Sequence, residues 1–246
     1  MRTYYFDAGN TRLKLWRCES GSLSAEYSAA HHGRPEELLS GLPEAFAEPP
    51  DALRGVSVLA PEQLQGLASA SLARWGLAPQ LAKSEASRGR VRSGYAEPQR
   101  LGVDRWLALL GADDGARAGP VCVADCGTAL TIDVMLEDGC HQGGYILPGI
   151  GMMAESLRSR TGGVRFDRLQ CRETGLGRDT AAAVGHGCLL AAVALIDRLA
   201  VDYGAQVVLT GGDAGYLRPH LRSRVVHEPH LLLKGLQRYF DDAGIR

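Results

Sequence analysis

Two segments of the chain, residues 3–16 and 121–134, share one pattern of hydrophobic and polar positions. Each begins with a short apolar run that ends in Asp-x-Gly, continues with a small polar residue, and then alternates apolar with polar side chains. This pattern predicts two adjacent strands joined by a tight glycine-bearing turn, so we expect a β-hairpin in each segment. The segments begin 118 positions apart, which is close to half of the 246 residues.

The repeat predicts two related α/β domains, residues 1–116 and 117–246, with the glycine-rich stretch 115–120 as their boundary. Hydrophobic periodicity and breaker residues predict the other elements. Helices are expected over 35–46, 61–75, 103–110, 149–160, 180–203 and 231–240, and strands over 53–59, 144–147 and 207–210. Asp179 or Thr180 is the expected cap of the long helix, whose many small residues suit a dimer seam or a domain interface.

The amino-acid composition indicates what kind of molecule the protein binds. The chain has 27 basic and 28 acidic side chains, so no general attraction to nucleic acid or to an anionic membrane is expected. We found no signal peptide and no run of about 18 apolar residues, which predicts a cytoplasmic protein. The 6 cysteines and 7 histidines lack the spacing of a disulfide framework or a zinc site. A small-molecule partner is therefore expected, and the 31 glycines favour close approach of backbone to a phosphate group.

The two Asp-x-Gly turns offer backbone amides for phosphate and carboxylates, Asp7 and Asp125, for counter-cations. One such turn is usually only a turn, whereas two in matching strand contexts favour a polyphosphate site. A Walker A motif is excluded, because none of the 3 lysines follows a glycine. A dinucleotide-type glycine motif at 149–154, with Asp167 as ribose-binding acid, is weaker than the interpretation that these glycines pack at a helix start.

A basic, glycine-containing loop over residues 88–102 precedes the helix expected at 103–110. Asp104 and Arg105 fall in the first turn of that helix. A carboxylate beside a guanidinium can orient a hydroxyl and an anionic substrate group, respectively. Taken alone, Asp104 is more simply read as a helix-capping residue.

Taken together, these motifs resemble the type III pantothenate kinases, the Bvg accessory factor family within the acetate and sugar kinase, Hsp70 and actin superfamily. The resemblance covers nearly the whole chain. Its motifs are residues 7–14, residues 125–133, Tyr95 with residues 102–105, residues 143–149 and residues 210–213. The resemblance implies an α/β fold of two duplicated ribonuclease-H-like (actin-like ATPase) domains with a cleft between them.

The resemblance also implies an activity, the ATP-dependent phosphorylation of pantothenate at the start of coenzyme A synthesis. The enzyme would be a homodimer that needs Mg²⁺ and a monovalent cation, K⁺ or NH₄⁺. Asp104 would be the general base and Asp125 the ligand of the monovalent cation, with Asp7 as a candidate Mg²⁺ ligand. ATP would be bound by Asp7, Ala8, Gly9, Asn10, Thr11, Arg12, Leu13, Lys14 and Thr128. Pantothenate would be bound by Tyr95, Gly102, Val103, Asp104, Arg105 and, from the partner subunit, Thr180.

Two other functions fit the same motifs. One is a different small-molecule kinase of the superfamily, and the other is a non-catalytic regulator that keeps only the nucleotide site. A protein that only binds nucleotide has little use for an acid at Asp104 beside Arg105, which favours a kinase. From the residues alone, the sequence predicts a two-domain α/β phosphotransferase that binds ATP.

Overall fold

A computed structural model describes residues 1–115, 118–166 and 172–241 of the chain. The chain forms two compact units, which are described here one at a time. The first contains residues 1–89, 97–111 and 232–246, and the second contains residues 90–96 and 112–231. The chain therefore crosses between the units more than once, whereas the sequence predicted a single boundary after residue 116.

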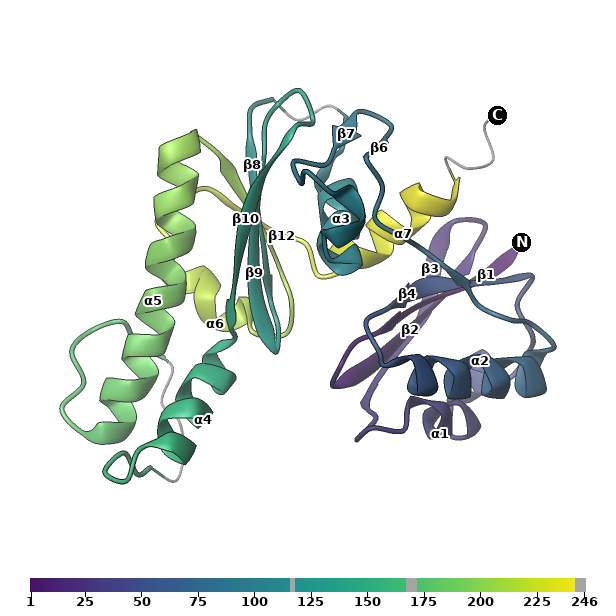
Figure 1. Ribbon diagram of the computed structural model, residues 1–246, viewed down its shortest axis with the longest axis horizontal. Helices are drawn as coiled ribbons and strands as arrows, with labels where there is room; N and C mark the ends of the chain where they lie inside the picture. The colour runs from purple at the N-terminus through teal and green to yellow at the C-terminus, as the bar shows by residue number, and fades with distance from the viewer. Residues whose placement is uncertain (116–117, 167–171, 242–246) are drawn as a thin grey trace. The chain divides into compact units, whose positions relative to one another are not determined.

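The first unit is built on a five-stranded mixed sheet with the order β3-β2-β1-β4-β5. Its strands are β1 (Arg2–Ala8), β2 (Arg12–Glu19), β3 (Ser22–Ala30), β4 (Ala52–Ser57) and β5 (Gln80–Leu81). β1 pairs antiparallel with β2 and parallel with β4. The helices α1 (Pro35–Ser40) and α2 (Pro61–Trp75) lie together on one face (Figure 1), where they enclose an apolar core against β1 and β2.

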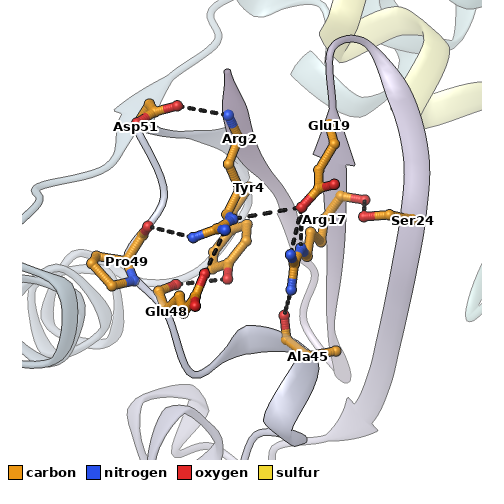
Figure 2. A network of polar contacts seen from close by, with 9 residues as sticks. All are labelled: Arg2, Tyr4, Arg17, Glu19, Ser24, Ala45, Glu48, Pro49 and Asp51. Atoms are coloured by element: carbon orange, nitrogen blue, oxygen red, sulfur yellow. Dashed lines mark hydrogen bonds and ion pairs between the residues drawn. The ribbon is translucent and has the colours of Figure 1, made fainter.

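Tyr4 is at the centre of this core and anchors the end of β1 that lies away from Asp7. Its ring meets those of Phe46, in the 3₁₀ turn Glu44–Phe46, and Trp75 edge-on, each at 5.3 Å. Its hydroxyl donates to the Glu48 carbonyl at 2.7 Å. Figure 2 shows that arginines from β1 and β2 extend this network along the same connection, which leads into β4. The network fixes the beginning of β1 and includes none of the residues of the turn.

Two helices from distant parts of the chain complete the first unit, α3 (Val103–Ala112) and α7 (Leu231–Asp241). At Gly235 a Cβ atom would lie 2.0 Å from the Leu107 carbonyl oxygen, so only glycine lets the two helices approach this closely. Arg238 Nη1 also donates to the Leu110 carbonyl at 2.6 Å. These contacts explain why the C-terminal helix belongs to the first unit.

The second unit repeats the strand order of the first, as β10-β9-β8-β11-β12. Its strands are β8 (Val121–Cys126), β9 (Ala129–Met135), β10 (His141–Pro148), β11 (Gln206–Thr210) and β12 (Val225–His227). β8 pairs antiparallel with β9 and parallel with β11, as β1 does with β2 and β4. The predicted duplication and the two predicted hairpins are therefore confirmed.

The helices of the second unit are α4 (Ile150–Arg160), α5 (Thr180–Tyr203), the short α6 (Ala214–Leu217) and a 3₁₀ turn, Arg218–His220. α5 packs on β8, β9 and β11, and Figure 1 shows it along one side of this sheet. Among the described residues α5 alone is long and apolar enough to cross a membrane, which the sequence analysis did not recognise. Its inner face belongs to the core, including Leu189, Val193 and Ile196, so its apolar character has a structural reason.

Most predicted elements are present with small differences at their ends. The helix predicted over 35–46 is instead α1 followed by a separate 3₁₀ turn, because Gly41 and Pro43 interrupt it. The sequence analysis missed β3, β5, β12 and α6. A separate two-stranded sheet, β6 (Ser87–Arg88) with β7 (Val91–Arg92), was also missed.

Candidate active site

The first Asp-x-Gly turn joins β1 to β2. Ala8 pairs with Leu13 across the hairpin, and the Gly9 amide donates to the Arg12 carbonyl at 3.1 Å. Ala8 and Leu13 are buried, so they contribute backbone groups only. Asn10, Thr11 and Arg12 are exposed at the tip of the turn. The tip therefore presents backbone and polar side chains to solvent on a rigid, buried base.

Asp7 lies at the end of β1, directly opposite Lys14 of β2. Lys14 Nζ is 3.4 Å from Asp7 Oδ2. Burial raises the pKa of the Asp7 carboxyl, the positive charge of Lys14 lowers it, and the negative charge of Asp104 raises it. The structure thus brings two predicted site residues, Asp7 and Asp104, within electrostatic reach of each other.

The second turn joins β8 to β9 and is one residue shorter. Cys126 pairs with Leu130, and the Gly127 amide donates to the Ala129 carbonyl at 3.0 Å. The offset between the repeats is therefore 118 residues in the first strand and 117 in the second strand, because Asn10 has no counterpart. Leu13 and Leu15 correspond to Leu130 and Ile132, and all four are buried.

Neighbouring backbone segments pack tightly against the second turn. The Gly149 amide donates to the Thr128 carbonyl at 2.9 Å, and the Asp213 amide donates to the Cys126 carbonyl at 2.8 Å. A Cβ atom on Gly149 would lie 2.2 Å from the Gly127 carbonyl oxygen. This close approach supports the interpretation of Gly149 as a packing glycine at the start of α4, whereas Asp167 lies outside the described residues.

Asp125 is the last residue but one of β8, at the base of the second turn, and is partly buried. Gly211 adopts φ +92°, and a Cβ atom there would lie 2.5 Å from Asp125 Oδ1 and 2.4 Å from the Cys126 carbonyl oxygen. The left-handed backbone of Gly211 lets the loop after β11 approach the carboxylate closely. Carboxylate and carbonyl oxygens are the donors that hard cations prefer.

Asp104 and Arg105 lie in the first turn of α3, as predicted. Asp104 Oδ1 accepts the Arg105 amide at 2.9 Å, and the Trp106 amide donates to the Gly102 carbonyl at 2.9 Å. A Cβ atom on Gly102 would lie 2.7 Å from Asp104 Oδ1, so glycine at this position leaves space for the carboxylate. Arg105 is 3% exposed, whereas Val103 is only partly buried. A buried guanidinium is an expensive feature, which is consistent with a specific role for Arg105.

Tyr95 belongs to the second unit, where its ring stacks on His141 at 6.1 Å with an angle of 13° between the planes. The His141 Nε2 atom is 2.8 Å from Asp133 Oδ1, and both side chains are almost fully buried. The Gly94 amide donates to His141 Nδ1 at 3.4 Å. This arrangement was missed in the sequence analysis, although Asp133 ends the second motif. Residues 95, 133 and 141 form no recognisable sequence motif, so their contacts could be found only from the structure.

Thr180 is exposed at the start of α5, and the residue that caps the helix is Asp179, whose side chain accepts the Ala182 amide at 2.8 Å. Thr180 lines an open groove of about 880 Å³ between α4 and α5, together with Met153, Leu157, Ala183 and Gly187. Thr180 therefore lies on an open surface of its own unit, accessible to another molecule.

The described part of the chain holds no cluster of three His, Cys, Asp or Glu side chains that could bind a metal ion. Five of the six cysteines are free, and Cys171 lies outside the described residues. Mg²⁺ in phosphoryl-transfer enzymes is usually bound by one or two carboxylates together with the phosphates. The Asp7 carboxylate, partly buried and near a second acid, fits that kind of site.

A model of the type III pantothenate kinase family matches residues 4–202. The chain belongs to this family. A type III pantothenate kinase from Nitrosococcus oceani is 35% identical over 250 residues, covering 97% of this chain and 93% of the relative. A second, from Acinetobacter baylyi, is 35% identical over 240 residues, covering 97% and 98%.

Solved structures place the fold among the actin-like ATPases. A Baf family protein from Campylobacter jejuni superposes with a TM-score of 0.64 at 17% identity, covering 99% of this chain and all of that protein. MreB 5 of Spiroplasma citri, bound to AMPPNP, superposes with a TM-score of 0.54 at 8% identity, covering 99% and 97%. At these identities the similarity concerns the fold alone. It confirms the predicted α/β class with an actin-like ATPase fold, which in this chain contains two mixed five-stranded sheets.

Proposed function

We propose that this protein transfers the γ-phosphoryl group of ATP to the primary hydroxyl of pantothenate, giving 4′-phosphopantothenate. Membership of the type III pantothenate kinase family carries this proposal. The first turn supports it, because an exposed tip on a buried hairpin is suited to phosphate and the acid of α3 lies within electrostatic reach of Asp7. An enzyme of this kind would work in the cytoplasm, where its substrates are small molecules.

ATP is proposed to bind along residues 7–14 and at Thr128. Ala8 and Leu13 are buried, so their part would be to hold the backbone in place, while the exposed tip, Asn10–Arg12, would contact the phosphates. Lys14 would neutralise phosphate charge from its position beside Asp7. The AMPPNP bound by the structurally similar MreB 5 is consistent with a nucleotide on this fold.

Asp104 is the proposed general base. The Arg105 amide binds one oxygen of its carboxylate, and the other oxygen would accept the proton of the pantothenate hydroxyl. Arg105 would bind the pantothenate carboxylate, with Tyr95, Gly102 and Val103 around the substrate. Phosphoryl transfer requires mainly positioning and charge neutralisation, which suits a site made of amides, one acid and cations.

Two cations are proposed. Asp7 would hold Mg²⁺ together with the ATP phosphates, and Asp125 would hold K⁺ or NH₄⁺ near the Cys126 carbonyl. When bound, the cations would neutralise charge on the phosphates.

The direct test is ADP release by the purified protein with pantothenate and with a panel of other small hydroxyl compounds, each with and without K⁺. We expect ADP release to depend on pantothenate and to increase with K⁺. A different compound as the best acceptor would indicate another kinase of the superfamily. Nucleotide binding with no acceptor-dependent ADP release would indicate a regulator.

Asp104→Asn tests the proposed base. We expect kcat to fall about 10²-fold or more, while both ligands still bind, because an amide cannot take the hydroxyl proton. Asp104→Ala should be assayed beside it, since a loose transition state demands less of a base. Turnover of Asp104→Asn within a few-fold of the unaltered protein would remove Asp104 from this role.

A homodimer is also proposed, in which Thr180 of the partner subunit would contact pantothenate. The open groove beside Thr180 and the small residues of α5 support close approach by a second copy. Co-expression of differently tagged Asp104→Asn and Thr180→Trp chains provides the test. A heterodimer would contain one site with both unaltered residues, so activity should exceed that of either variant alone. Purified heterodimers without this gain would show that Thr180 acts within its own chain or not at all.

A further inference from the structure

His31 contacts the first turn through two hydrogen bonds, one from its ring and one from its backbone. It follows β3 and is only 4% exposed. Its Nε2 atom is 2.8 Å from the Gly9 carbonyl oxygen, and its own amide donates to the Thr11 carbonyl at 3.2 Å. In the sequence analysis His31 had no part in a zinc site, and no pattern linked it to the turn.

The hydrogen bonds around the ring favour one tautomer of the neutral imidazole. The Gly33 amide donates to His31 Nδ1 at 3.1 Å, so Nδ1 is an acceptor and carries no proton. In the neutral ring the proton is then on Nε2, which donates it to the Gly9 carbonyl. The imidazole is therefore held between one donor and one acceptor of the backbone.

The segment that carries His31 is itself fixed to α2. His32 and Gly33 adopt φ +47° and +88°, and the Arg34 amide closes the turn on the His31 carbonyl at 2.7 Å. Gln63, in the first turn of α2, donates through Nε2 to the Gly33 carbonyl at 2.9 Å. A continuous chain of hydrogen bonds thus runs from a helix end to the first turn.

Peptide planarity gives these contacts a consequence for ligand binding. In a trans peptide the carbonyl and the following N–H point in opposite directions. By binding the Gly9 carbonyl, His31 turns the Asn10 N–H away from itself, at a residue that is exposed. Carbonyl oxygens repel a phosphate and amides attract it, so holding the carbonyl of Gly9 on the protein side favours binding of an anion at the tip.

We propose that His31 is a positioning residue for the nucleotide, which holds the Gly9–Asn10 peptide in the orientation that binds phosphate. This inference rests on the proposed function only in that the ligand is a nucleoside polyphosphate. In the second repeat Gly149 follows β10 as His31 follows β3, and its amide donates to the Thr128 carbonyl as the His31 amide does to the Thr11 carbonyl. Gly149 has no side chain, so the contact made by the imidazole belongs to the first repeat alone.

Two conservative variants separate the bonds that the ring makes. The amide of His31→Gln reaches about as far as Nε2 and can donate to Gly9, whereas His31→Asn reaches about as far as Nδ1 and can accept from Gly33. We expect KM for ATP to rise about tenfold in His31→Asn, the effect of one lost hydrogen bond to a buried carbonyl, and less than threefold in His31→Gln. KM for pantothenate should stay within twofold in both variants.

Mg²⁺-ADP titrated into each protein by calorimetry gives a readout that does not depend on turnover, and the same ordering of affinities is expected. His32→Asn is the matched control, because His32 is exposed and asparagine tolerates its positive φ. A Phe46→Leu variant, which removes a core contact with Tyr4 at the end of β1 away from the turn, shows the effect of lost stability alone.

Equal ADP affinities for His31→Asn and His31→Gln would overturn the proposal, as would parallel rises in both KM values or the same ATP effect in Phe46→Leu. No ADP binding by the unaltered protein would also overturn it. If ADP binds with the expected ordering but no ADP is released with pantothenate, the proposed activity is wrong and the role of His31 stands. His31→Leu adds a variant with neither bond, and the comparison of Asn with Gln decides the question even if the Leu variant does not fold.

Discussion

The two Asp-x-Gly turns begin from the same sequence pattern, yet the protein holds them in different ways. A buried side chain, His31, binds the Gly9 carbonyl of the first turn. The Gly149 and Asp213 amides bind the Thr128 and Cys126 carbonyls of the second turn, as the His31 and Val58 amides bind the Thr11 and Ala8 carbonyls of the first. Gly149 stands where His31 does but has no side chain, so the second turn lacks the contact that the imidazole makes. The first turn is also longer by one residue, Asn10, which lies exposed at its tip.

This difference is what we expect if the two turns have the separate roles proposed for them. A longer turn with an exposed tip and a lysine beside its acid suits the flexible, highly charged phosphates of a nucleotide. A shorter turn enclosed by close-packed backbone suits a small ion that needs fixed oxygen ligands. Because the two sheets have the same strand order, the two turns occupy equivalent positions in their units. They differ in length and in the groups that pack against them.

The largest effect is expected where backbone packs against the second turn. In Gly149→Ala the new Cβ would lie 2.2 Å from the Gly127 carbonyl oxygen and 2.6 Å from that of Thr128. Neither oxygen can move without distorting the turn, so the free energy of unfolding should fall by about 1–3 kcal/mol, and activity should fall with it. Chemical denaturation and ADP release measure the two effects.

Gly151→Ala is the matched control for this substitution. Gly151 lies two residues further along, is exposed, and has open space where a Cβ would lie. Alanine is the better helix former by about 1 kcal/mol, so this variant should be as stable as the unaltered protein or slightly more so. Equal losses in the two variants would mean that the contact of Gly149 with the turn is unimportant.

A smaller effect is expected at the acid of the first turn. Burial raises the pKa of Asp7, so the folded protein holds this proton more tightly than the unfolded chain does. The ionised carboxylate therefore destabilises the ligand-free protein as the pH rises through the folded-state pKa. Asp7→Asn should stabilise the metal-free protein at pH 7 by about 1 kcal/mol, on the scale typical of functional-site substitutions.

The pH dependence distinguishes this cause from a general gain in packing. Below about pH 3, where the carboxyl is protonated in both states, the two proteins should have equal stability. Thermal unfolding without Mg²⁺ at several pH values provides the measurement. A lower melting temperature for Asp7→Asn at pH 7 would show that the ionised carboxylate stabilises the fold.

The smallest effect is expected at Cys126, which corresponds to Ala8 of the first hairpin. Burial raises the pKa of the Cys126 thiol above its ordinary range, and burial raises that of Cys122 to about 12. Neither thiol should react with a thiolate-specific reagent at pH 8 in the folded protein. Cys126→Ala should change the free energy of unfolding by about 1 kcal/mol or less and leave K⁺ dependence unaltered. Rapid labelling of Cys126 in the folded protein would contradict its burial.

The sequence predicted the duplication, both hairpins and most helices, because these depend on local hydrophobic periodicity and turn residues. The helix over 61–75 was predicted with the bounds that the structure has. β3 was missed although polar and apolar residues alternate along it, whereas the three residues of β12 are too few to show a period. Both strands are stabilised by pairing with a neighbouring strand.

Contacts that join distant parts of the chain could not be predicted. His31 reaches the Gly9 carbonyl because β3 pairs with β2. Tyr95 stacks on His141 although the two residues are far apart in the sequence, and no periodicity predicts that contact. The assignment of α7 to the first unit likewise depends on the absence of a side chain at Gly235. For the same reason the motifs indicated the place of Asp7 and Asp104, but not the electrostatic interaction between them.

Paired titrations of Asp7→Ala and Asp125→Ala test whether the two turns bind different cations, as we propose. ADP release with pantothenate is measured while Mg-ATP is varied at fixed K⁺, and then while K⁺ is varied at fixed Mg-ATP. We predict that Asp7→Ala weakens the use of Mg-ATP and keeps the K⁺ response, whereas Asp125→Ala loses the K⁺ response. A wild-type K⁺ response in Asp125→Ala, or identical changes in both variants, would contradict the account.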